Sequence, residues 1–561
     1  MTLSTLSPGL ILVLGGLLLP LLRGRGRDLA VLALPLVTLA AVWAVPEGTA
    51  GIVDFLGLAI EPVRGSTLGR LFATVFSIMA FAGGLYAVRH ARTLELAAAL
   101  VYAGSAIGVT FAGDLFTLFI FWEIMAVGST VVIWAADTDR AYRASIRYLL
   151  VHLFGGVVLM FGIAAYVAET GSVTFELMQL EGIGTWLILA GFLVNAGAPP
   201  LSAWIADAYP EASPSGTVFL SAFTTKTAVY ALLVGFAGSA ILIPIGLYMI
   251  FYGIVYALLE NDMRRILAYS IVNQVGFMVT GIGVGTTMAM NGVAAHAFAH
   301  IIYKGLLFMA AGGVLLRTGR RLCTDLGGLF RTMPLTTLFG TIGAISISSF
   351  PFTSGFVSKS MISQAAADEH LAIAWFLLTA ASAGVFLHAG IKFPWFVFFQ
   401  KDSGLRPPES PGNMKVAMAL FSFLCIFLGV FPAPLYAILP FPVEYVPYTV
   451  AHLVSQFQLL LFAGLAFFVM LPMMKRTTTL TLDWDWGYRH LAPRVVHWIG
   501  HVGSAAWSSF AAGPRQRYDA VVGGLFRAHG PHGPLARSWP IGSMVFWVAI
   551  MLLAYLLLAL L

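Results

Sequence analysis

Long apolar stretches separated by short polar segments recur along almost the whole chain. A membrane-spanning helix needs about 20 predominantly apolar residues. Sixteen stretches meet that requirement, centred near residues 14, 37, 78, 104, 124, 156, 195, 226, 250, 275, 306, 350, 385, 422, 460 and 550. The pattern therefore predicts an all-α polytopic membrane protein with about 16 transmembrane helices.

The first apolar stretch, Leu6–Leu22, has no small-residue cleavage site after it, and a second apolar stretch follows at once. We therefore expect a retained helix and not a signal peptide. The composition agrees with a membrane protein: 59% of residues are hydrophobic and 10% are charged, against about 25% charged in soluble domains. The two cysteines, Cys323 and Cys425, form no metal or redox motif.

Basic residues are distributed unevenly between the two predicted sides of the membrane. With the first helix starting outside, the inner loops up to the fourteenth helix hold seventeen Lys and Arg residues, and the outer loops hold only Arg64 and Arg70. Cytoplasmic loops carry the excess of basic residues in membrane proteins. We therefore expect a cell (inner) membrane location with both termini outside, and the net charge of +6 reflects inner loops and indicates no nucleic-acid partner.

Two apolar stretches carry helix-breaking residues at mid-membrane. VNAGAPPLSAW contains Gly197, Pro199 and Pro200, and ISSFPFTSGFVSK contains Pro351 and Gly355. Proline removes a backbone donor and clashes with the preceding turn, and freed backbone groups are tolerated in lipid only where they line a cavity or are buried in protein. Paired interruptions in corresponding positions of two halves predict a transport site.

The interruptions divide the chain into predicted parts. Residues 1–90 hold three scaffold helices, and 94–235 and 241–400 form two five-helix repeats, each with a broken fourth helix. Five is an odd number, so the second repeat is inverted relative to the first. Residues 401–561 hold the last three helices, with a membrane-surface helix within 487–528 or, alternatively, an irregular loop there.

One carboxylate falls in the middle of an apolar helix, Glu123 within Asp114–Ala135. An ionised carboxylate at membrane depth is costly, so such a residue is a functional candidate by default. A static ion pair that locks two helices is the alternative.

Four lysines lie deep in apolar sequence: Lys226, Lys304, Lys359 and Lys392. A buried lysine can lose its proton, whereas arginine stays charged, so lysine suits a proton path. Lys392 lies near a helix end, where its side chain can instead reach the interface.

Two histidines precede one of these lysines at four-residue spacing, as His296, His300 and Lys304. That spacing places all three on one face of a helix, which favours a proton relay over ordinary core histidines. Zinc binding lacks an evident third ligand.

No phosphate loop, nucleotide fingerprint, iron–sulfur cysteine set or nucleophile elbow is present, so we expect no cofactor and no redox chemistry or ATP hydrolysis by the chain itself.

Five motifs resemble a known family: DLFTLFIFWEIM, WIADAYPEASPSGTVFLSAFTTKTAVYALL, NDMRRILAYSIVNQVGFM, HAFAHIIYKGLLFMAAG and FPFTSGFVSKSMI. They are similar to the antiporter-like subunits shared by Mrp-type cation/proton antiporters and respiratory complex I, above all to the D-type member of the Mrp antiporters. The resemblance covers about 94–400. It implies a proton path through Glu123, Lys226, His300 and Lys359, with His296 and Lys304 adjacent.

One position departs from the family pattern, because Asn195 stands where the family has a lysine. An amide cannot hold a transferred proton. Three accounts follow: Lys226 pairs with Glu123 instead, a sodium ion binds to the Glu123 carboxylate and the amide oxygen, or this copy has lost transport and acts as a scaffold.

The resemblance implies a proton/cation-translocating subunit of a multisubunit Mrp-type Na⁺/H⁺ antiporter. Its partners would be lipid and other membrane subunits, including further antiporter-like subunits and small Mrp-type subunits. One alternative is a membrane-arm subunit of a complex I-like or hydrogenase redox complex. The other is a structural membrane partner in an energy-coupled inorganic-carbon uptake system.

Overall fold

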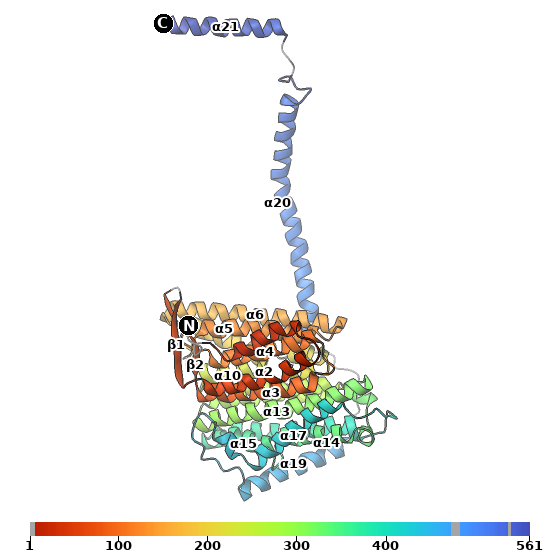
Figure 1. Ribbon diagram of the computed structural model, residues 1–561. Coiled ribbons are helices and arrows are strands. Elements are labelled where there is room, and N and C mark those ends of the chain that lie inside the picture. The colour runs from red at the N-terminus through yellow and green to blue at the C-terminus, as the bar shows by residue number, and fades with distance from the viewer. Residues whose placement is uncertain (1–5, 56, 473–482, 537–539, 561) are drawn as a thin grey trace. The chain divides into compact units, whose positions relative to one another are not determined.

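The computed structural model describes residues 6–55, 57–472, 483–536 and 540–560. The chain forms two compact units, Met1–Asp485 and Trp486–Leu561. The first unit contains every candidate residue named above. Its helices lie side by side with roughly parallel axes (Figure 1).

Helices make up most of the first unit. Before the first interruption they are α1 (Gly9–Leu18), η2 (Leu19–Leu21), α2 (Gly24–Ala44), α3 (Thr67–Ala87), α4 (Thr93–Phe111), α5 (Leu115–Trp134), α6 (Asp139–Thr170) and α7 (Ile183–Ala196). Between the two interruptions they are α8 (Trp204–Ala208), η3 (Tyr209–Glu211), α9 (Gly216–Leu220), α10 (Thr224–Gly235), α11 (Leu242–Leu259), α12 (Met263–Val284), α13 (Thr287–Thr318), η4 (Cys323–Asp325), η5 (Leu329–Arg331) and α14 (Pro334–Ile347). After the second they are α15 (Ser354–Asp368), α16 (Ala372–Val385), η6 (Phe386–Lys392), η7 (Trp395–Phe399), α17 (Gly412–Val430), α18 (Ala433–Tyr436) and α19 (Val450–Met470).

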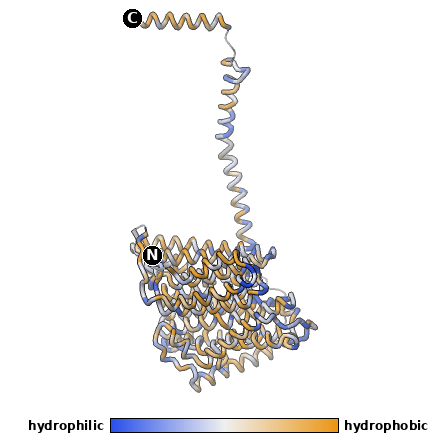
Figure 2. The backbone as a smooth tube through the Cα atoms, viewed as in Figure 1, coloured by the Kyte–Doolittle hydropathy of each residue, from blue (hydrophilic) through white to orange (hydrophobic). Residues whose placement is uncertain are grey.

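Fourteen of the sixteen predicted spans coincide with a helix, and the spans centred near 226 and 350 are each divided into two helices. Among the described residues, thirteen helices are long and apolar enough to cross a membrane, and three shorter apolar helices occupy the remaining positions: Gly9–Leu21, Ile183–Ala196 and Pro334–Ile347. Hydrophobic residues dominate the helices of this unit, and many of the hydrophilic ones gather in the loops at the helix ends (Figure 2). The prediction of an all-α polytopic membrane protein is therefore confirmed.

The order of helices repeats along the chain. In both predicted repeats the third helix, α6 or α13, has 32 residues, and the fourth, α7 or α14, has 14 residues before the chain breaks. Asp114 caps α5 and bridges to Thr174 after α6, while Asp262 caps α12 and bridges to Leu322 after α13. This correspondence favours the two-repeat organisation, which stays a prediction.

An antiparallel hairpin, β1 (Gly48–Phe55) and β2 (Leu58–Gly65), connects α2 and α3. The hydropathy pattern did not predict it. The hairpin is tied to the helical bundle, because the backbone N–H of Glu61 donates to Asp114 (3.0 Å) and the Arg64 guanidinium donates to the carbonyl of Phe175 (3.1 Å). Arg64 also pairs with Glu61.

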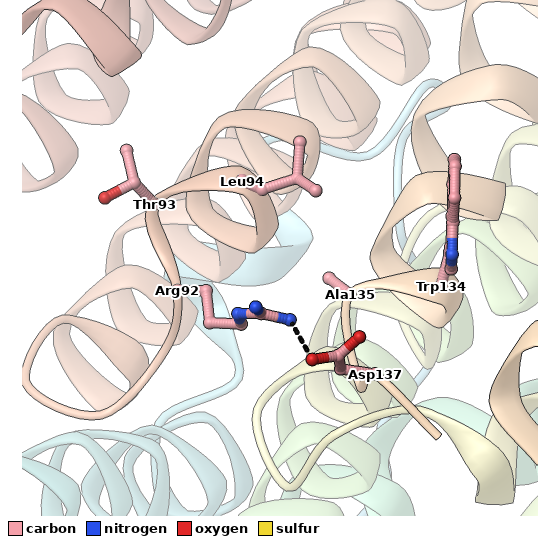
Figure 3. Close-up of a pocket in the computed structure, with 6 residues that line it drawn as sticks. All are labelled: Arg92, Thr93, Leu94, Trp134, Ala135 and Asp137. Carbon is pink, nitrogen blue, oxygen red and sulfur yellow. Dashed lines mark ion pairs between the residues drawn. The ribbon is translucent and has the colours of Figure 1, made fainter. Parts of the chain in front are cut away.

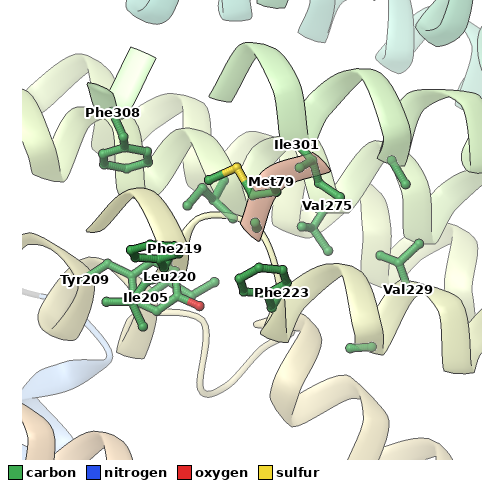
Figure 4. Packing of buried hydrophobic residues seen from close by; sticks show 14 of the residues in the cluster. Met79, Ile205, Tyr209, Phe219, Leu220, Phe223, Val229, Val275, Ile301 and Phe308 are labelled. Carbon is green, nitrogen blue, oxygen red and sulfur yellow. The ribbon is translucent and has the colours of Figure 1, made fainter. Parts of the chain in front are cut away.

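The helix α13 is central to the bundle, since it contacts α3, α12, α14, α15 and α17. The core beside it joins both halves of the chain: Phe219 and Phe223 lie near Met79 and Ile301 (Figure 4). Close packing of this kind, and not water exclusion, holds helices together in lipid. The ionisable residues His296, His300 and Lys304 of α13 are thereby buried inside the bundle.

The second unit holds η8 (Gly487–Leu491), α20 (Ala492–His529) and the apolar α21 (Ile541–Leu560). Thus 487–528 is helical and not an irregular loop. Its attachment to a membrane surface stays a prediction.

Candidate functional site

The first predicted break lies directly after α7. Gly197 ends this helix with a φ of +79°, a conformation that glycine adopts without steric cost, and α8 begins at Trp204. Pro199 and Pro200 lie between the two helices. The Trp204 indole N–H donates to the carbonyl of Val194 (2.9 Å), so a side chain satisfies a backbone group at the break.

The second break covers Ser348–Thr353, between α14 and α15, and includes Pro351. Gly355 was predicted to be part of it but lies in the first turn of α15. A Cβ on Gly355 would stand 1.9 Å from the carbonyl oxygen of Ser346. Gly355 is therefore a close-approach glycine that lets the two half-helices meet, and Lys359 follows one turn later.

A third break was not predicted. The stretch centred at residue 226 was expected to be one helix, but α9 ends at Leu220 and α10 begins at Thr224. The Lys226 ammonium donates to the carbonyl of Ser221 (2.7 Å) and to the Thr225 hydroxyl (3.0 Å). The freed carbonyl and the buried ammonium therefore satisfy each other.

The Glu123 carboxyl group lies between α5 and α6. Its Oε1 would stand 2.1 Å from a Cβ on Gly156 and has no hydrogen-bond partner among the described residues. The expected pairing with Lys226 does not occur, because the Lys226 ammonium is held by Ser221 and Thr225 at the third break.

Asn195 is fully buried near the end of α7, and neither atom of its amide has a hydrogen-bond partner in the described part of the chain. Its Oδ1 stands 3.7 Å from the Cβ position of Gly155. Glu123 and Asn195 thus pack against consecutive glycines of α6. Buried polar atoms without partners are costly, so the Glu123 carboxyl oxygen and the Asn195 amide are candidates for a functional site.

The predicted stripe His296, His300 and Lys304 lies on α13 and is fully buried. His296 hydrogen-bonds through Nε2 to Gln274 Oε1 (3.1 Å), and the Tyr303 hydroxyl donates to the same oxygen (3.1 Å). Sequence reasoning missed Gln274 and Tyr303. In the sequence, each is only a polar side chain inside an apolar helix, and that feature does not distinguish a proton-path residue from one that serves packing.

The three other lysines differ in their contacts. The Lys359 ammonium stands 4.9 Å from the ring centroid of Phe277 and has no hydrogen-bond partner among the described residues. Lys304 donates to the carbonyl of Leu267 (3.2 Å). Lys392 donates to the carbonyls of Ala257, Leu258 and Glu260 at the C-terminal end of α11 (2.5–3.0 Å), a place that favours cations.

The loops carry ion pairs of a different kind. A pocket of about 440 Å³ at the ends of α4 and α5 is lined by Arg92 and Asp137, which form an exposed pair at 2.8 Å (Figure 3). In the loop after η7, a hydrogen bond from Arg406 lowers the pKa of the exposed Asp402 carboxyl well below its usual value. Exposed pairs contribute little stability, and neither lies within a spanning helix.

Comparison with known proteins gives consistent results. A family model described as "NADH:quinone oxidoreductase/Mrp antiporter, TM" matches residues 112–387. The chain is 30% identical to the D-type subunit of the Na⁺/H⁺ antiporter of Alkalihalophilus pseudofirmus over 59% of its own length and 71% of that protein. It is 30% identical to the M-type subunit of the NADH-quinone oxidoreductase of Pseudomonas aeruginosa over 59% and 70%. It is 24% identical to hydrogenase-4 component B of Escherichia coli over 70% and 64%.

Two solved structures share the fold. A protein of the Mrp complex from Dietzia sp. DQ12-45-1b superposes with a TM-score of 0.70 at 22% identity, covering 83% of this chain and 99% of that one. A protein of an archaeal membrane-bound sulfane sulfur reductase gives a TM-score of 0.70 at 23% identity, covering 98% and 99%.

Proposed function

The chain belongs to the family of antiporter-like membrane subunits that NADH:quinone oxidoreductases and Mrp antiporters share, and we propose that it is the proton- and cation-translocating subunit of a multisubunit Mrp-type Na⁺/H⁺ antiporter. The observation that carries the proposal is the set of buried ionisable groups left without hydrogen-bond partners. Among the described residues these include the Lys359 ammonium and both ring nitrogens of His300. Such groups are expensive inside a membrane and mark ion pathways.

Charge coupling supplies the mechanism. Lys226 lies on α10, which packs against the α13 helix that carries His300 and Lys304, and Lys359 lies on α15, which also packs against α13. Neighbouring groups of like charge oppose each other's protonation. A proton arriving at Lys226 therefore favours release from the α13 stripe, and the stripe passes its proton towards Lys359.

The cation is proposed to bind beside Glu123. The carboxylate oxygen and the amide oxygen of Asn195 pack against consecutive glycines, Gly156 and Gly155, and hard oxygen ligands suit an alkali cation. In this account the Asn195 departure lets the Glu123 carboxyl bind a cation as well as a proton.

Transport by the assembled complex in proteoliposomes tests the proposal. Glu123→Ala and Lys359→Ala should each reduce Na⁺-driven proton movement by about 100-fold, the typical contribution of a positioned proton-transfer group. Arg320→Ala, on an exposed loop, is the control. Unaltered antiport in both path variants would contradict the function.

Membership of a redox complex is the second candidate. The similarity to the M-type oxidoreductase subunit and to hydrogenase-4 component B favours it. The redox centres would then lie on partner subunits, so purification of the intact complex decides. Co-purifying iron–sulfur subunits support this candidate, and small Mrp-type subunits support the first.

A structural role in an energy-coupled inorganic-carbon uptake system is the third candidate, and the Asn195 departure favours it. The Asn195→Lys variant discriminates. A purely structural subunit shows no proton flux in either form, whereas a transporting subunit shows flux that the added lysine alters.

A further inference from the structure

Four hydroxyl groups form a continuous hydrogen-bonded chain through the first half of the bundle. Tyr102 of α4 bonds Thr224 Oγ1 of α10 (2.6 Å), and Thr224 Oγ1 bonds the Tyr148 hydroxyl of α6 (3.2 Å). The Tyr148 hydroxyl donates to Ser129 Oγ of α5 (2.9 Å). All four side chains are at most 1% exposed. The chain of hydroxyls therefore crosses four helices away from lipid and solvent.

The hydroxyls can all point in one direction. The backbone N–H of Thr224 donates to the Tyr102 oxygen (2.9 Å), and Ser129 donates to the carbonyl of Met125 (2.7 Å). Tyr102 is left to donate to Thr224, Thr224 to Tyr148, and Tyr148 to Ser129. Each of the last three hydroxyls then both accepts and donates, which is the arrangement that proton hopping needs.

One part of this chain of hydroxyls adjoins Lys226. Thr224 is the first residue of α10, directly after the third break. The next residue, Thr225, accepts a hydrogen bond from the Lys226 ammonium (3.0 Å). The Lys226 ammonium therefore bonds the residue next to Thr224, within the first turn of α10.

Another part adjoins Glu123. Tyr148, His152 and Gly156 follow at four-residue spacing along α6, which places them on one face. The His152 ring stacks on Tyr148 with centroids 3.9 Å apart, and its Nε2 has no partner among the described residues. Glu123 Oε1 packs against Gly156 at the other end of this face.

We propose that the Thr224 and Tyr148 hydroxyls conduct protons between Lys226 and the face of α6 that carries His152 and Glu123. The inference rests on the proposed translocating function and adds the route within it. In the transfer, one N–H bond of Lys226 breaks and the Thr224 oxygen gains that proton. Thr224 releases its own proton to Tyr148, and Tyr148, once its hydroxyl turns from Ser129, releases its own proton to Nε2 of His152, which has no partner among the described residues. One O–H bond forms and one breaks at every oxygen, so the hydroxyls end neutral and no co-reactant is consumed.

The route answers a need that is specific to this protein. Glu123 and Lys226 do not pair, and the Asn195 amide cannot hold a transferred proton. Hydroxyls can bridge that gap without carrying a charge of their own, so they avoid the cost of another buried ion.

A packing role is the alternative, in which the hydroxyls only satisfy one another beside the third break. Two substitutions at Thr224 separate the roles. Thr224→Val keeps the shape and removes the hydroxyl, whereas Thr224→Ser keeps the hydroxyl. Proton flux through the assembled complex should fall about 100-fold in Thr224→Val and in Tyr148→Phe, and stay within about twofold of the native flux in Thr224→Ser.

The matched control is Tyr230→Phe. Tyr230 is also a buried tyrosine, and its hydroxyl donates to the carbonyl of Thr110 (2.8 Å) outside this chain of hydroxyls. Its loss should leave flux near the native level. If Thr224→Val does not assemble, Tyr148→Phe decides.

The outcomes separate this inference from the proposed function. Native flux in both hydroxyl variants, with flux abolished in Glu123→Ala, overturns the route and leaves the function standing. Native flux in all three overturns the function as well. Equal losses in Tyr230→Phe and Tyr148→Phe indicate packing and also overturn the route.

Discussion

Glu123 owes its position to Gly156 of α6, and Asn195 lies beside the adjacent Gly155. Any larger residue at 156 would collide with the carboxyl group, since a Cβ there would stand 2.1 Å from Oε1. The apolar sequence around Gly155 and Gly156 gave no sign of this function. At the residue scale, the candidate site therefore depends on the lack of a side chain at position 156 as much as on the Glu123 carboxyl group itself.

Gly156→Ala tests that dependence. The added methyl should displace the Glu123 carboxyl and lower antiport to roughly the level of Glu123→Ala. Gly26→Ala is the control, because its Cβ would meet nothing within 4 Å. Transport by equal amounts of assembled complex is the measurement, and native transport in Gly156→Ala would show that the carboxyl need not stay in place.

Lys392 was predicted to be a path residue, yet three backbone carbonyls hold its ammonium at the end of α11. Lys392→Met should destabilise the protein by about 2–3 kcal/mol, because hydrogen bonds from a charged group are lost and carbonyls stay buried. Thermal unfolding measures this change. Transport per assembled complex should remain within about twofold, and a complete loss with unchanged stability would return Lys392 to the path.

At the scale of elements, the three breaks differ in how they arise. Proline and glycine in the sequence marked the first two, because they act through local backbone geometry. The third, Ser221–Phe223, contains neither residue. There the Lys226 ammonium satisfies the freed carbonyl of Ser221, so a tertiary arrangement stabilises a break that local sequence does not require.

Gly355→Ala tests the packing of the second break. Its methyl would stand 1.9 Å from the carbonyl oxygen of Ser346, so α14 and α15 must move apart and Lys359 with them. The amount of assembled complex and its antiport should both fall sharply. Gly412→Ala, whose Cβ meets nothing within 4 Å, should behave like the native protein; native assembly and transport in Gly355→Ala would contradict the close approach.

At the scale of the whole molecule, one buried guanidinium joins the two predicted repeats. Arg264 of α12 donates to the carbonyl of Pro210 in η3 and to those of Ala212 and Ser213 in the loop before α9, each at 2.8 Å. Ion pairs of Arg321 with Asp262 (2.8 Å) and Glu211 (3.3 Å) surround it. The contact holds the Lys226 half of the path against the α13 half.

Arg264→Met should cost about 3–5 kcal/mol of folding free energy, the usual effect of removing one partner from a buried charged network. The thermal unfolding midpoint in detergent measures it. Arg320→Met, on an exposed loop, should leave the unfolding midpoint unchanged. Equal midpoints for the two variants would show that the Arg264 contacts contribute nothing to stability.

The predicted orientation can be tested with introduced cysteines. Glu176→Cys, in an exposed loop predicted to be outside, should react with an impermeant thiol reagent in intact cells. Arg320→Cys, predicted to be inside, should react only after the cells are opened. The native cysteines, Cys323 and Cys425, are buried and should stay silent, and the reverse labelling pattern would invert the topology.

The sequence by itself determined the helices, the two proline-containing breaks and the stripe of His296, His300 and Lys304. These features follow from apolar length, proline geometry and four-residue spacing, all of which are local. Only the tertiary structure decided which polar groups meet. It separates Glu123 from Lys226, seats Lys392 on α11, and joins Tyr102, Thr224, Tyr148 and Ser129 from four different helices. Such contacts depend on how helices distant in sequence pack against one another, and hydrophobic periodicity does not predict that packing.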